Sequence, residues 1–456
     1  MKRLLGLGLL VLPAVTPAGV VVAQTSVVAQ TPVVAQTSVV AQTPTEAVQP
    51  PPASPAPAPV SSEAVLDSLV RVALERNPRI QAAESTWRAS EERVPQAGAL
   101  ADPMLSVTSE GAPIRNPSPT NAPMAKIGVT QMFEFPGKQG AMRRSMAEMA
   151  AMQREELTGA QLEVAADVRR AWYDLYALQR SIDILEQNLE STRLLAGVAR
   201  SRYEVGAAGQ QDVLRGMVET SSIDSRLAVL RAQIPAARAR LNLLLDQPAD
   251  APLPVARVEE TVIAAPAIEL LEAQALEQQP MLAAQRREVA SRRASLALAR
   301  KAGLPDFTVG LEYMADKEMD DSWMGMIGVT LPIWRGSKVG PARREAEAEL
   351  AAAQGRETEA RNEAIRMVRE EAAMLESQRA TVELYRGTIL PQADLALASA
   401  RTAYENGRAD FLTLLDAQRF LFDSQTRYAQ ALADQAKSLV DLRLAAGDRR
   451  LLGERD

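Results

Sequence analysis

One order of short motifs occurs twice in this chain, about 200 residues apart. The paired segments are Ala73–Pro78 with Ala275–Pro280, Ile127–Thr130 with Ile327–Thr330, Lys138–Arg144 with Lys338–Arg344, and Tyr203–Gly206 with Tyr404–Gly407. Their spacings are 202, 200, 200 and 201 residues. This period is far longer than that of stacked solenoid repeats. The sequence therefore predicts a duplicated unit, with repeats at 61–255 and 256–446 and a C-terminal tail at 447–456.

Each half contains the same order of expected elements, which is helix, strand, strand and helix. A helical region is expected at 62–100 in the first half and at 267–303 in the second. Pro103 and Pro305 should end these regions, because proline breaks a helix and favours extended backbone in the residue before it. A long helix then follows each strand pair, with chain reversals expected at Gly206–Gly209 and at Gly407.

The two strand-like segments of each half alternate apolar with small or polar residues, which is the pattern of a sheet with one apolar face. The apolar positions of the second half are Phe307, Val309, Leu311 and Tyr313, followed by Trp323, Ile327, Val329 and Leu331. Those of the first half are Leu105 and Val107, followed by Ile127, Val129, Phe133 and Phe135. Strands of about 9–11 residues are long enough to cross a bilayer at a tilt.

The long helix of the first half is expected at Gln139–Ala199. About 60 residues at about 1.5 Å each extend roughly 90 Å, which exceeds the width of a globular core. Its apolar residues recur every seven positions, as in a coiled coil, at Val168, Leu175, Ile182 and Leu189. The returning helix has apolar residues three and four apart between Leu227 and Leu244. In the second half Pro391 interrupts the long helix and should bend it.

The N-terminus has the features of an export signal at 1–23. Lys2 and Arg3 precede a short apolar run, and Val21–Ala23 forms a small-residue cleavage site. A transmembrane anchor is the less favoured alternative, because the apolar run is short and contains prolines. A low-complexity segment rich in Val, Ala, Gln, Thr and Pro follows at 24–60, and its composition is typical of a flexible or extended tether.

Residue types limit the chemistry of the chain. The 456 residues include no Cys and no His, which removes disulfides, thiolate metal sites and the commonest catalytic bases. Neither an enzyme nor a cofactor is predicted. The net charge of -6 comes without a basic block, so nucleic acid is not an expected partner. Methionines cluster at Met314–Met326 and Met142–Met152. Thioethers suit soft Cu(I), but adaptable packing is the favoured interpretation and no metal site is predicted.

Four strands cannot close a barrel, and open strand edges cannot lie in lipid. If the strands cross a membrane, several chains must share one barrel, and three chains would supply twelve strands. The alternative is a soluble sheet patch. Residues at the strand ends favour the membrane, with an aromatic girdle predicted at Phe133, Phe135 and Trp334. Basic residues predicted at the lipid head groups are Lys138, Arg143, Arg144, Lys338, Arg343 and Arg344. A solvated helix start is the alternative for these charges.

The duplicated order, the segment Gln131–Lys138 and the two Tyr-Glu-x-Gly turns together resemble the TolC-like outer-membrane efflux proteins over residues 62–446. The resemblance implies a mainly α fold with a small transmembrane β part. It implies a homotrimer whose α-helical barrel is continuous with a shared 12-stranded β-barrel, placed in outer-membrane lipid with a long periplasmic extension. The implied function is the exit duct of a tripartite efflux pump. The partners are a periplasmic adaptor and an inner-membrane transporter, for which the resistance-nodulation-division type is one candidate. The segment Gln131–Lys138 is most similar to members that serve metal-efflux pumps.

The same resemblance places functional residues at the periplasmic tip. The tip turns would contain Tyr203, Gly206, Tyr404 and Gly407. A closing latch would pair Asp212 with Tyr404, near Arg408, and Asp416 would line the pore constriction as an acidic ring. The chain departs from the family at Ala409, where a gate arginine is missing, and at Thr413, which replaces a second pore acid. Helix capping or plain surface charge is the alternative role for Asp212 and Asp416.

A periplasmic coiled-coil adaptor or scaffold of an export system is the alternative function. An adaptor would contain one helical hairpin and a β-rich domain, whereas the helical unit is duplicated in this chain. A scaffold would leave the two matched strand pairs without a purpose.

Overall fold

The computed structural model describes residues 62–111, 115, 122–258, 260–264, 267–317 and 319–453. The predicted signal at 1–23 and linker at 24–60 lie outside the described residues, as does the end of the tail at 454–456. The elements of the described part are α1 (Ser62–Arg76), α2 (Pro78–Ala97), β1 (Met104–Glu110), β2 (Met124–Phe133), α3 (Lys138–Glu204), α4 (Gln210–Leu244), α5 (Ile268–Gln278), α6 (Pro280–Lys301), β3 (Asp306–Asp316), β4 (Ser322–Thr330), η2 (Arg335–Val339), α7 (Gly340–Leu384), η3 (Tyr385–Ile389), α8 (Leu390–Glu405), α9 (Phe411–Ala445) and η4 (Arg449–Leu452).

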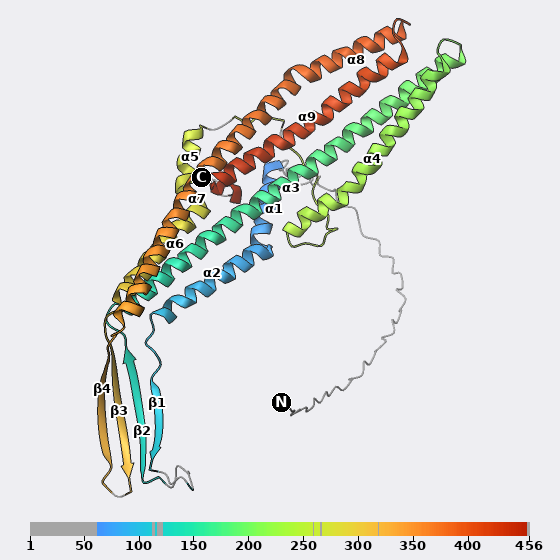
Figure 1. Ribbon diagram of the computed structural model, residues 1–456. Helices are drawn as coiled ribbons and strands as arrows, with labels where there is room; N and C mark the ends of the chain where they lie inside the picture. The colour runs from blue at the N-terminus through green and yellow to red at the C-terminus, as the bar shows by residue number, and fades with distance from the viewer. Residues whose placement is uncertain are drawn as a thin grey trace, which may run out of the picture. The chain divides into compact units, whose positions relative to one another are not determined.

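The predicted order of elements occurs twice in the structure (Figure 1). In both halves a side-chain cap followed by proline starts the second helix. The Asn77 side chain accepts a hydrogen bond from the Arg79 amide before Pro78, and the Gln279 side chain accepts one from the Leu282 amide before Pro280. Proline is favourable at the first helical position because that amide has no partner within the helix. The repeated Ala-Leu-Glu-x-x-Pro motif is therefore a helix junction.

The longest helix, α3, contains 67 residues and lies against α2, α4, α6 and α9. The predicted heptad residues are all buried, with exposed fractions of 0% for Val168 and Leu175, 9% for Ile182 and 8% for Leu189. The corresponding segment of the second half is interrupted, because a five-residue π-helical turn, η3, separates α7 from α8. Pro391 lies in the first turn of α8, where its missing amide no longer disrupts a helical ladder. The interruption predicted at Pro391 is therefore a π-bulge.

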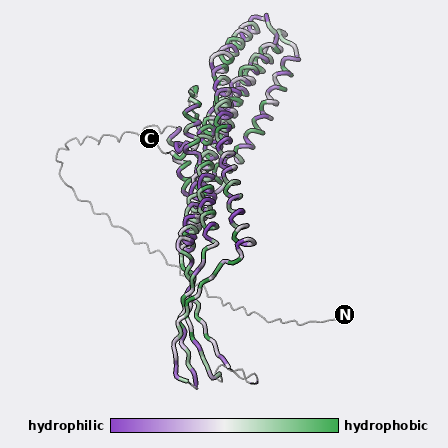
Figure 2. The backbone as a smooth tube through the Cα atoms, turned by 60° about the vertical axis from the view of Figure 1, so that its left-hand side comes forward, coloured by the Kyte–Doolittle hydropathy of each residue, from purple (hydrophilic) through white to green (hydrophobic). Residues whose placement is uncertain are grey.

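The four strands form one antiparallel sheet in the order β1-β2-β3-β4, which joins the two halves of the chain through the β2–β3 pair. Figure 2 shows the strands side by side, with hydrophobic and hydrophilic residues interspersed. Three strands have 9 to 11 residues. The first has only 7, because Gly111 turns the chain with a positive φ of 80° directly after Glu110. Large apolar residues of this sheet are exposed, including Val107 at 74% and Ile327 at 82%.

The C-terminal tail packs tightly against both halves. Gly447 has a φ of 68°, and a Cβ atom there would lie 2.8 Å from the backbone of Gln278 and Gln279. Leu451 is fully buried, and its carbonyl oxygen accepts a hydrogen bond from Arg169, which also forms an ion pair with Asp67 at 2.7 Å. The tail therefore closes the core around α3.

Among the described residues, no helix combines the length and the hydropathy required to cross a membrane. The predicted mainly α class with a small β part is confirmed by the structure.

Candidate functional site

Two turns at the end of the helical hairpins have the same backbone geometry. The Gly206 amide donates to the Tyr203 carbonyl at 2.9 Å, and the Ala207 amide donates to the Arg202 carbonyl at 2.7 Å. The equivalent bonds of the second turn join Gly407 to Tyr404 at 3.1 Å and Arg408 to Ala403 at 2.8 Å. Gly206 and Gly407 both have positive φ values, 78° and 68°. Each turn is a Schellman cap, in which glycine is favoured at the left-handed position.

The side chains of the two turns differ. Tyr203 is 46% exposed, whereas Tyr404 is 5% exposed and packs against Phe411 with ring centroids 5.8 Å apart. Arg202 of α3 lies over the Tyr404 ring at 4.7 Å and donates a hydrogen bond to the Tyr404 carbonyl oxygen at 2.6 Å. A cation over an aromatic face and a charge-assisted hydrogen bond are both stabilising. Arg202 therefore fastens the first hairpin to the second.

The predicted latch between Asp212 and the Tyr404 hydroxyl is not formed in this structure. The hydroxyl is buried and has no hydrogen-bond partner among the described residues of the chain. Burial raises the pKa of Tyr404, and the nearby Asp212 carboxylate adds to that rise, while Arg202 opposes it. The structure therefore brings Asp212 close to Tyr404 without a bond between them. The phenol packs inward between α8 and α9, which is the physical reason why the expected hydrogen bond is absent.

The predicted pore residue Asp416 is not an isolated charge. Its carboxylate lies 3.4 Å from Arg419, and the same guanidinium binds the buried Glu219 of α4. Two residues after Asp416, the Gln418 amide donates to Asn188 at 3.0 Å and to Thr192 at 2.8 Å on α3. These contacts form a polar layer between the two hairpins, a short distance along the helices from the tip turns. Arg408 is exposed, and its backbone amide closes the second turn.

At the other end of the helices, Lys138 differs from its predicted position among lipid head groups. It is 8% exposed, and its ammonium binds both carboxylate oxygens of Asp306, at 2.8 Å and 3.0 Å, and the Leu304 carbonyl oxygen at 2.9 Å. The Phe135 amide also donates to Asp306, at 2.7 Å. Burial in the monomer excludes contact with lipid head groups. Lys138 instead ties the first half to the second where the strands meet the helices, which we call the neck.

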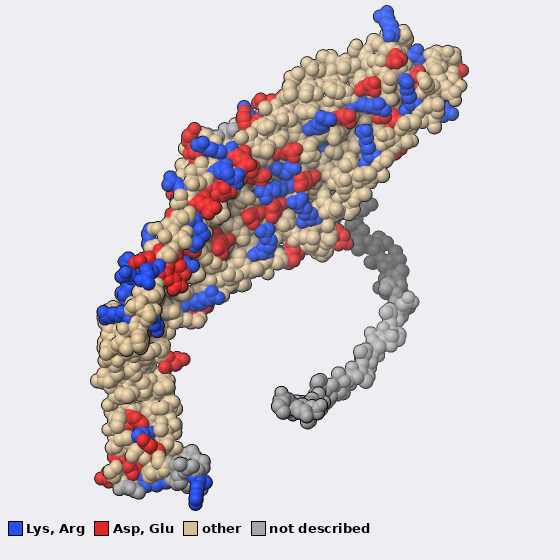
Figure 3. All heavy atoms as spheres, viewed as in Figure 1, with Lys and Arg blue, Asp and Glu red and all other residues tan. Residues whose placement is uncertain are grey.

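The other residues predicted at the membrane interface lie near the neck and are accessible. Phe133 ends β2, Phe135 is half-buried two residues further on, and Trp334 is 68% exposed after β4. Basic residues that are exposed here are Arg143, Arg144, Lys338, Arg343 and Arg344. Figure 3 shows basic side chains gathered where helices meet strands, followed by a band of strand surface without charge and then by charged side chains toward the far end of the strands. The contact of these residues with the lipid interface stays a prediction.

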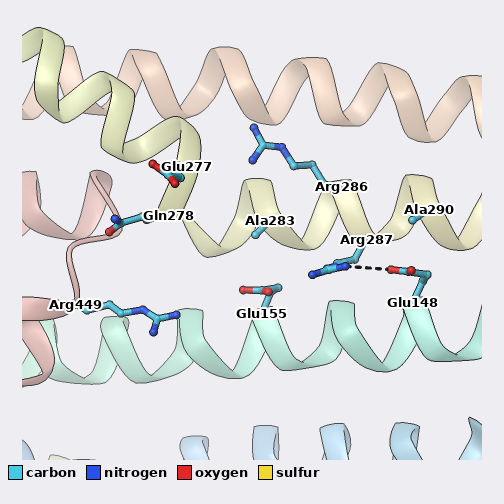
Figure 4. Close-up of a pocket in the computed structure, with 9 residues that line it drawn as sticks. All are labelled: Glu148, Glu155, Glu277, Gln278, Ala283, Arg286, Arg287, Ala290 and Arg449. Atoms are coloured by element: carbon cyan, nitrogen blue, oxygen red, sulfur yellow. Dashed lines mark hydrogen bonds and ion pairs between the residues drawn. The ribbon is translucent and has the colours of Figure 1, made fainter.

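A recess between α3 and α6 has a volume of about 670 Å³. Its acidic residues are Glu148, Glu155 and Glu277, and its basic residues are Arg286, Arg287 and Arg449. Figure 4 shows Arg287 reaching Glu148, an ion pair of 3.4 Å. The charges balance one another, and the chain has no His or Cys to accompany them. The recess is consistent with polar packing between the two halves.

Sequence reasoning missed Arg202, Glu219, Arg419 and Asp306. A signal for Arg202 was present, because the duplicated turn has Ala403 at the same position, and a charge found in only one copy suggests a role between the copies. Glu219 and Arg419 lie 200 residues apart on helices α4 and α9, and their contact is set by tertiary packing, which the repeat spacing does not reveal. The alternation of the strands gave no signal for Asp306, because its partner is 168 residues away.

Comparison with known proteins agrees with this architecture. The family described as outer membrane efflux protein matches residues 69–247 and 271–448, one segment in each half. The chain is 25% identical over 392 residues to the cobalt-zinc-cadmium resistance protein CzcC of Cupriavidus metallidurans, covering 84% of this chain and 91% of that protein.

Two solved structures share the fold. CusC, which forms a transmembrane channel, matches with a TM-score of 0.74 at 17% identity, over 84% of this chain and 92% of that chain. The outer membrane protein VceC of Vibrio cholerae matches with a TM-score of 0.71 at 18% identity, over 84% of this chain and 96% of that chain.

The family match covers most of the described residues, and the duplicated helical hairpins with their strand pairs account for it. An adaptor with one hairpin does not fit these findings. The chain belongs to the outer membrane efflux protein family, and it is an outer-membrane exit duct of tripartite efflux with a long periplasmic helical part.

Proposed function

We propose that three copies of this chain close one barrel and act as a duct that is sealed at the tip of the helical hairpins. The observation that carries this proposal is the sheet with two edges, β1 and β4, and an exposed apolar face. Unpaired backbone groups cost several kcal/mol in lipid. Pairing β4 of one copy with β1 of the next satisfies them, and three copies give twelve strands, within the range of closed barrels.

The contacts of Arg202 support a seal at the tip. Arg202 holds the first hairpin to Tyr404 of the second, and Arg419 joins Glu219 to Asp416 further along the same helices. Opening of the tube requires these hairpins to move apart. Asp212 and Arg408 remain available for contacts with neighbouring copies, because neither side chain has an ion pair or hydrogen bond among the described residues. Three copies of Asp416 near the tip would favour cations in the constriction.

The partners proposed for the duct are a periplasmic adaptor and an inner-membrane transporter, with the resistance-nodulation-division type as a candidate. Metal cations are the proposed substrates. The similarity to CzcC, which is named for cobalt, zinc and cadmium resistance, supports this class of substrate. The domain division into a signal at 1–23, a linker at 24–60, repeats at 61–255 and 256–446 and a tail at 447–456 is part of the proposal.

The trimer is tested by extracting the full-length protein from outer membranes in detergent and measuring its mass by light scattering and native mass spectrometry. A trimer that forms pores in planar bilayers is expected. A monodisperse monomer that stays in solution without detergent would exclude the shared barrel.

The seal is tested with Arg202→Met, which keeps the apolar stem and removes the charge. Loss of a charge-assisted hydrogen bond of about 1.5 kcal/mol should raise the open fraction by about tenfold. Single-channel conductance in bilayers measures this. Arg200→Met is the matched control, because Arg200 is exposed on the same helix and, among the described residues, pairs only with Glu204, at 3.6 Å. Tyr404→Phe should have little effect, since the hydroxyl has no hydrogen-bond partner in the part of the chain that the structure describes. Equal conductance of Arg202→Met and wild type would exclude Arg202 from the seal.

A further inference from the structure

The strand register separates two classes of apolar residue onto opposite faces of the sheet. Each register pairs even-numbered with even-numbered residues, for example Met104 with Thr130, Met124 with Asp316 and Asp306 with Thr330. Even-numbered residues therefore share one face. All six methionines of the four strands lie on it, at Met104, Met124, Met132, Met314, Met324 and Met326. Within the strands that face has no Leu, Ile, Val, Phe or Trp, and all such residues lie on the odd-numbered face.

The methionine face is the one that looks into the channel if the proposed barrel forms. It also contains Lys126, Glu312 and most of the small and hydroxyl residues of the strands. In a transmembrane barrel the face toward lipid is an apolar band, and the face toward the lumen is polar. The odd-numbered face, with its aliphatic and aromatic residues, is therefore the lipid face, and the methionines line the lumen.

Contact with water alone would not favour methionine on the face toward the lumen. Barrel interiors that contact water are usually polar, and a general need for apolar packing would mix methionine with leucine and valine on both faces. The sheet also has room for these side chains. The Met326 methyl carbon lies 3.1 Å from the point where a Cβ of Gly310 would be, so this thioether lies across the glycine on the neighbouring strand. The glycine therefore leaves the Met326 thioether the space that it occupies on the inner face of the sheet.

Four of the methionines form a continuous band across β2, β3 and β4. Met314 pairs directly with Lys126 and Ser322, which makes Met124 and Met324 its diagonal neighbours. Diagonal neighbours in a sheet lie about 7–8 Å apart at their Cα atoms, within reach of long flexible side chains. Met326 follows Met324 on the same strand and face, about 7 Å further on. Neighbouring thioethers in this band are therefore close enough to share one ion.

Carboxylates surround the band. Met124 lies directly between Glu110 of β1 and Asp316 of β3, and Met324 is paired with Glu312. The three carboxylates are accompanied by one ammonium group, that of Lys126, so this part of the face has a net charge of -2 per chain. Lys126 is itself bound to Glu110 at 2.5 Å. The resulting field attracts cations and disfavours anions.

We propose that this methionine band binds soft monovalent cations, Cu(I) foremost, as cargo in transit through the lumen. Thioethers select Cu(I) over harder ions such as Zn(II). The chain has no Cys and no His, so methionine is its only sulfur ligand and its only soft one. The proposal rests on the proposed barrel and narrows its substrate class within the metal cations.

The test uses Ag(I) in nitrate buffer as a stable analogue of Cu(I), with full-length protein in planar bilayers. The triple variant Met314→Leu, Met324→Leu and Met326→Leu removes three thioethers at nearly constant volume. The matched control makes the same change at three exposed methionines outside the sheet, Met142, Met149 and Met374. Ag(I) should block wild type and control at concentrations lower than those needed for the triple variant by about tenfold, equivalent to about 1.4 kcal/mol. Block by Zn(II) should be equal in all three proteins.

X-ray absorption at the silver edge, measured on the loaded wild-type protein, supplies a second readout that needs no variant. Sulfur is expected among the nearest neighbours of silver. Oxygen neighbours alone, or equal block of all three proteins by Ag(I), would overturn the methionine proposal and would mean that the methionines are only an apolar lining. Wild-type protein that forms no pores would instead overturn the duct on which the proposal rests.

Discussion

The two halves of the chain share a motif at the neck but use it differently. Lys138 and Lys338 occupy the same place in the repeated Lys-x-Gly-x-x-Arg-Arg segment. Lys138 starts α3 and is buried against Asp306, whereas Lys338 lies in the π-helical turn η2 and is exposed. The difference follows from their neighbours, since β2 is paired with β3 in the same chain while β4 is an edge strand. Duplicated residues therefore differ according to whether the chain itself supplies the adjacent strand.

The hairpin tips repeat this contrast. Both turns are Schellman caps, because the backbone geometry is set locally by Gly206 and Gly407. Arg202 has no basic counterpart at Ala403, and the start of α9 is capped by Asp410 while α4 starts at Gly209 without a side-chain cap. The backbone geometry of the turns is thus duplicated, whereas the contact of Arg202 with the other half and the side-chain cap of Asp410 each occur once.

The largest difference between the halves should appear on replacing the two neck lysines. Lys138→Met leaves the Asp306 carboxylate without its cationic partner, and breaking a pair of this burial costs about 3 kcal/mol. Lys338→Met removes an exposed charge and should cost less than about 1 kcal/mol. The measurement is the temperature at which the extracted oligomer dissociates on a gel, with unfolding followed by circular dichroism.

The double variant Lys138→Met with Asp306→Leu is the control for this comparison. Replacing both partners of a buried pair by apolar residues is often neutral, so much of the lost stability should return. Equal destabilisation by Lys138→Met and Lys338→Met would contradict the contrast and would mean that neighbouring copies bury Lys338 to the same degree.

Alanine substitutions at the glycines with positive φ should distinguish the cost of the left-handed backbone conformation from the cost of steric contact. A Cβ at Gly206 or Gly407 would meet no atom within 4 Å, so alanine there should cost only the left-handed conformation, about 1–2 kcal/mol, and equally in both turns. Gly447→Ala adds contacts of 2.8 Å with the backbone of the preceding helix junction and should cost more. Hydrogen exchange of the tip peptides and thermal unfolding measure the two effects. Unequal costs at Gly206 and Gly407 would show that the turns are not equivalent.

Much of the fold could be predicted from the sequence because its determinants are local or periodic. The heptad of α3, the alternation of the strands and the paired helix junctions each depend on residues close in sequence. The duplication then predicted the order of these elements, because the same order occurs in both halves. The C-terminal tail was less visible, because its packing depends on Gly447 and Leu451 meeting segments far away in the chain.

The candidate site was less predictable for a physical reason. In the sequence, Lys138 has the features of a surface charge that follows an aromatic strand end. It is buried in an ion pair because its partner, Asp306, is distant in sequence but close in the fold. Tyr404 was predicted to donate a hydrogen bond, yet its ring packs inward on Phe411 under Arg202. Such pairings depend on the packing of helices from different halves, which neither spacing nor composition reveals.

The smallest expected effect concerns the start of α9, where the halves differ by a single cap. Asp410 accepts hydrogen bonds from the Thr413 hydroxyl and from the Thr413 amide at 2.9 Å, and these bonds lower its pKa below the ordinary value of 3.8. A lowered pKa means that the cap stabilises the folded state above the ordinary value and loses this effect as the pH falls through the lowered one. Hydrogen exchange of the peptide around Thr413 should therefore accelerate at acidic pH beyond its intrinsic dependence.

Asp410→Asn retains a capping side chain without an acid group, so its exchange should lose this extra pH dependence while the helix start remains ordered. The converse substitution introduces a cap at the start of α4, which has none. Gly209 has extended backbone, with φ -80° and ψ 153°, which suits a capping residue. Gly209→Asp should therefore slow exchange at the start of α4 by an amount that corresponds to a few tenths of a kcal/mol. It should also give α4 the acid-sensitive exchange of α9. If Asp410→Asn keeps the acid sensitivity of wild type, another group near the tip titrates in its place, and the cap is not the cause.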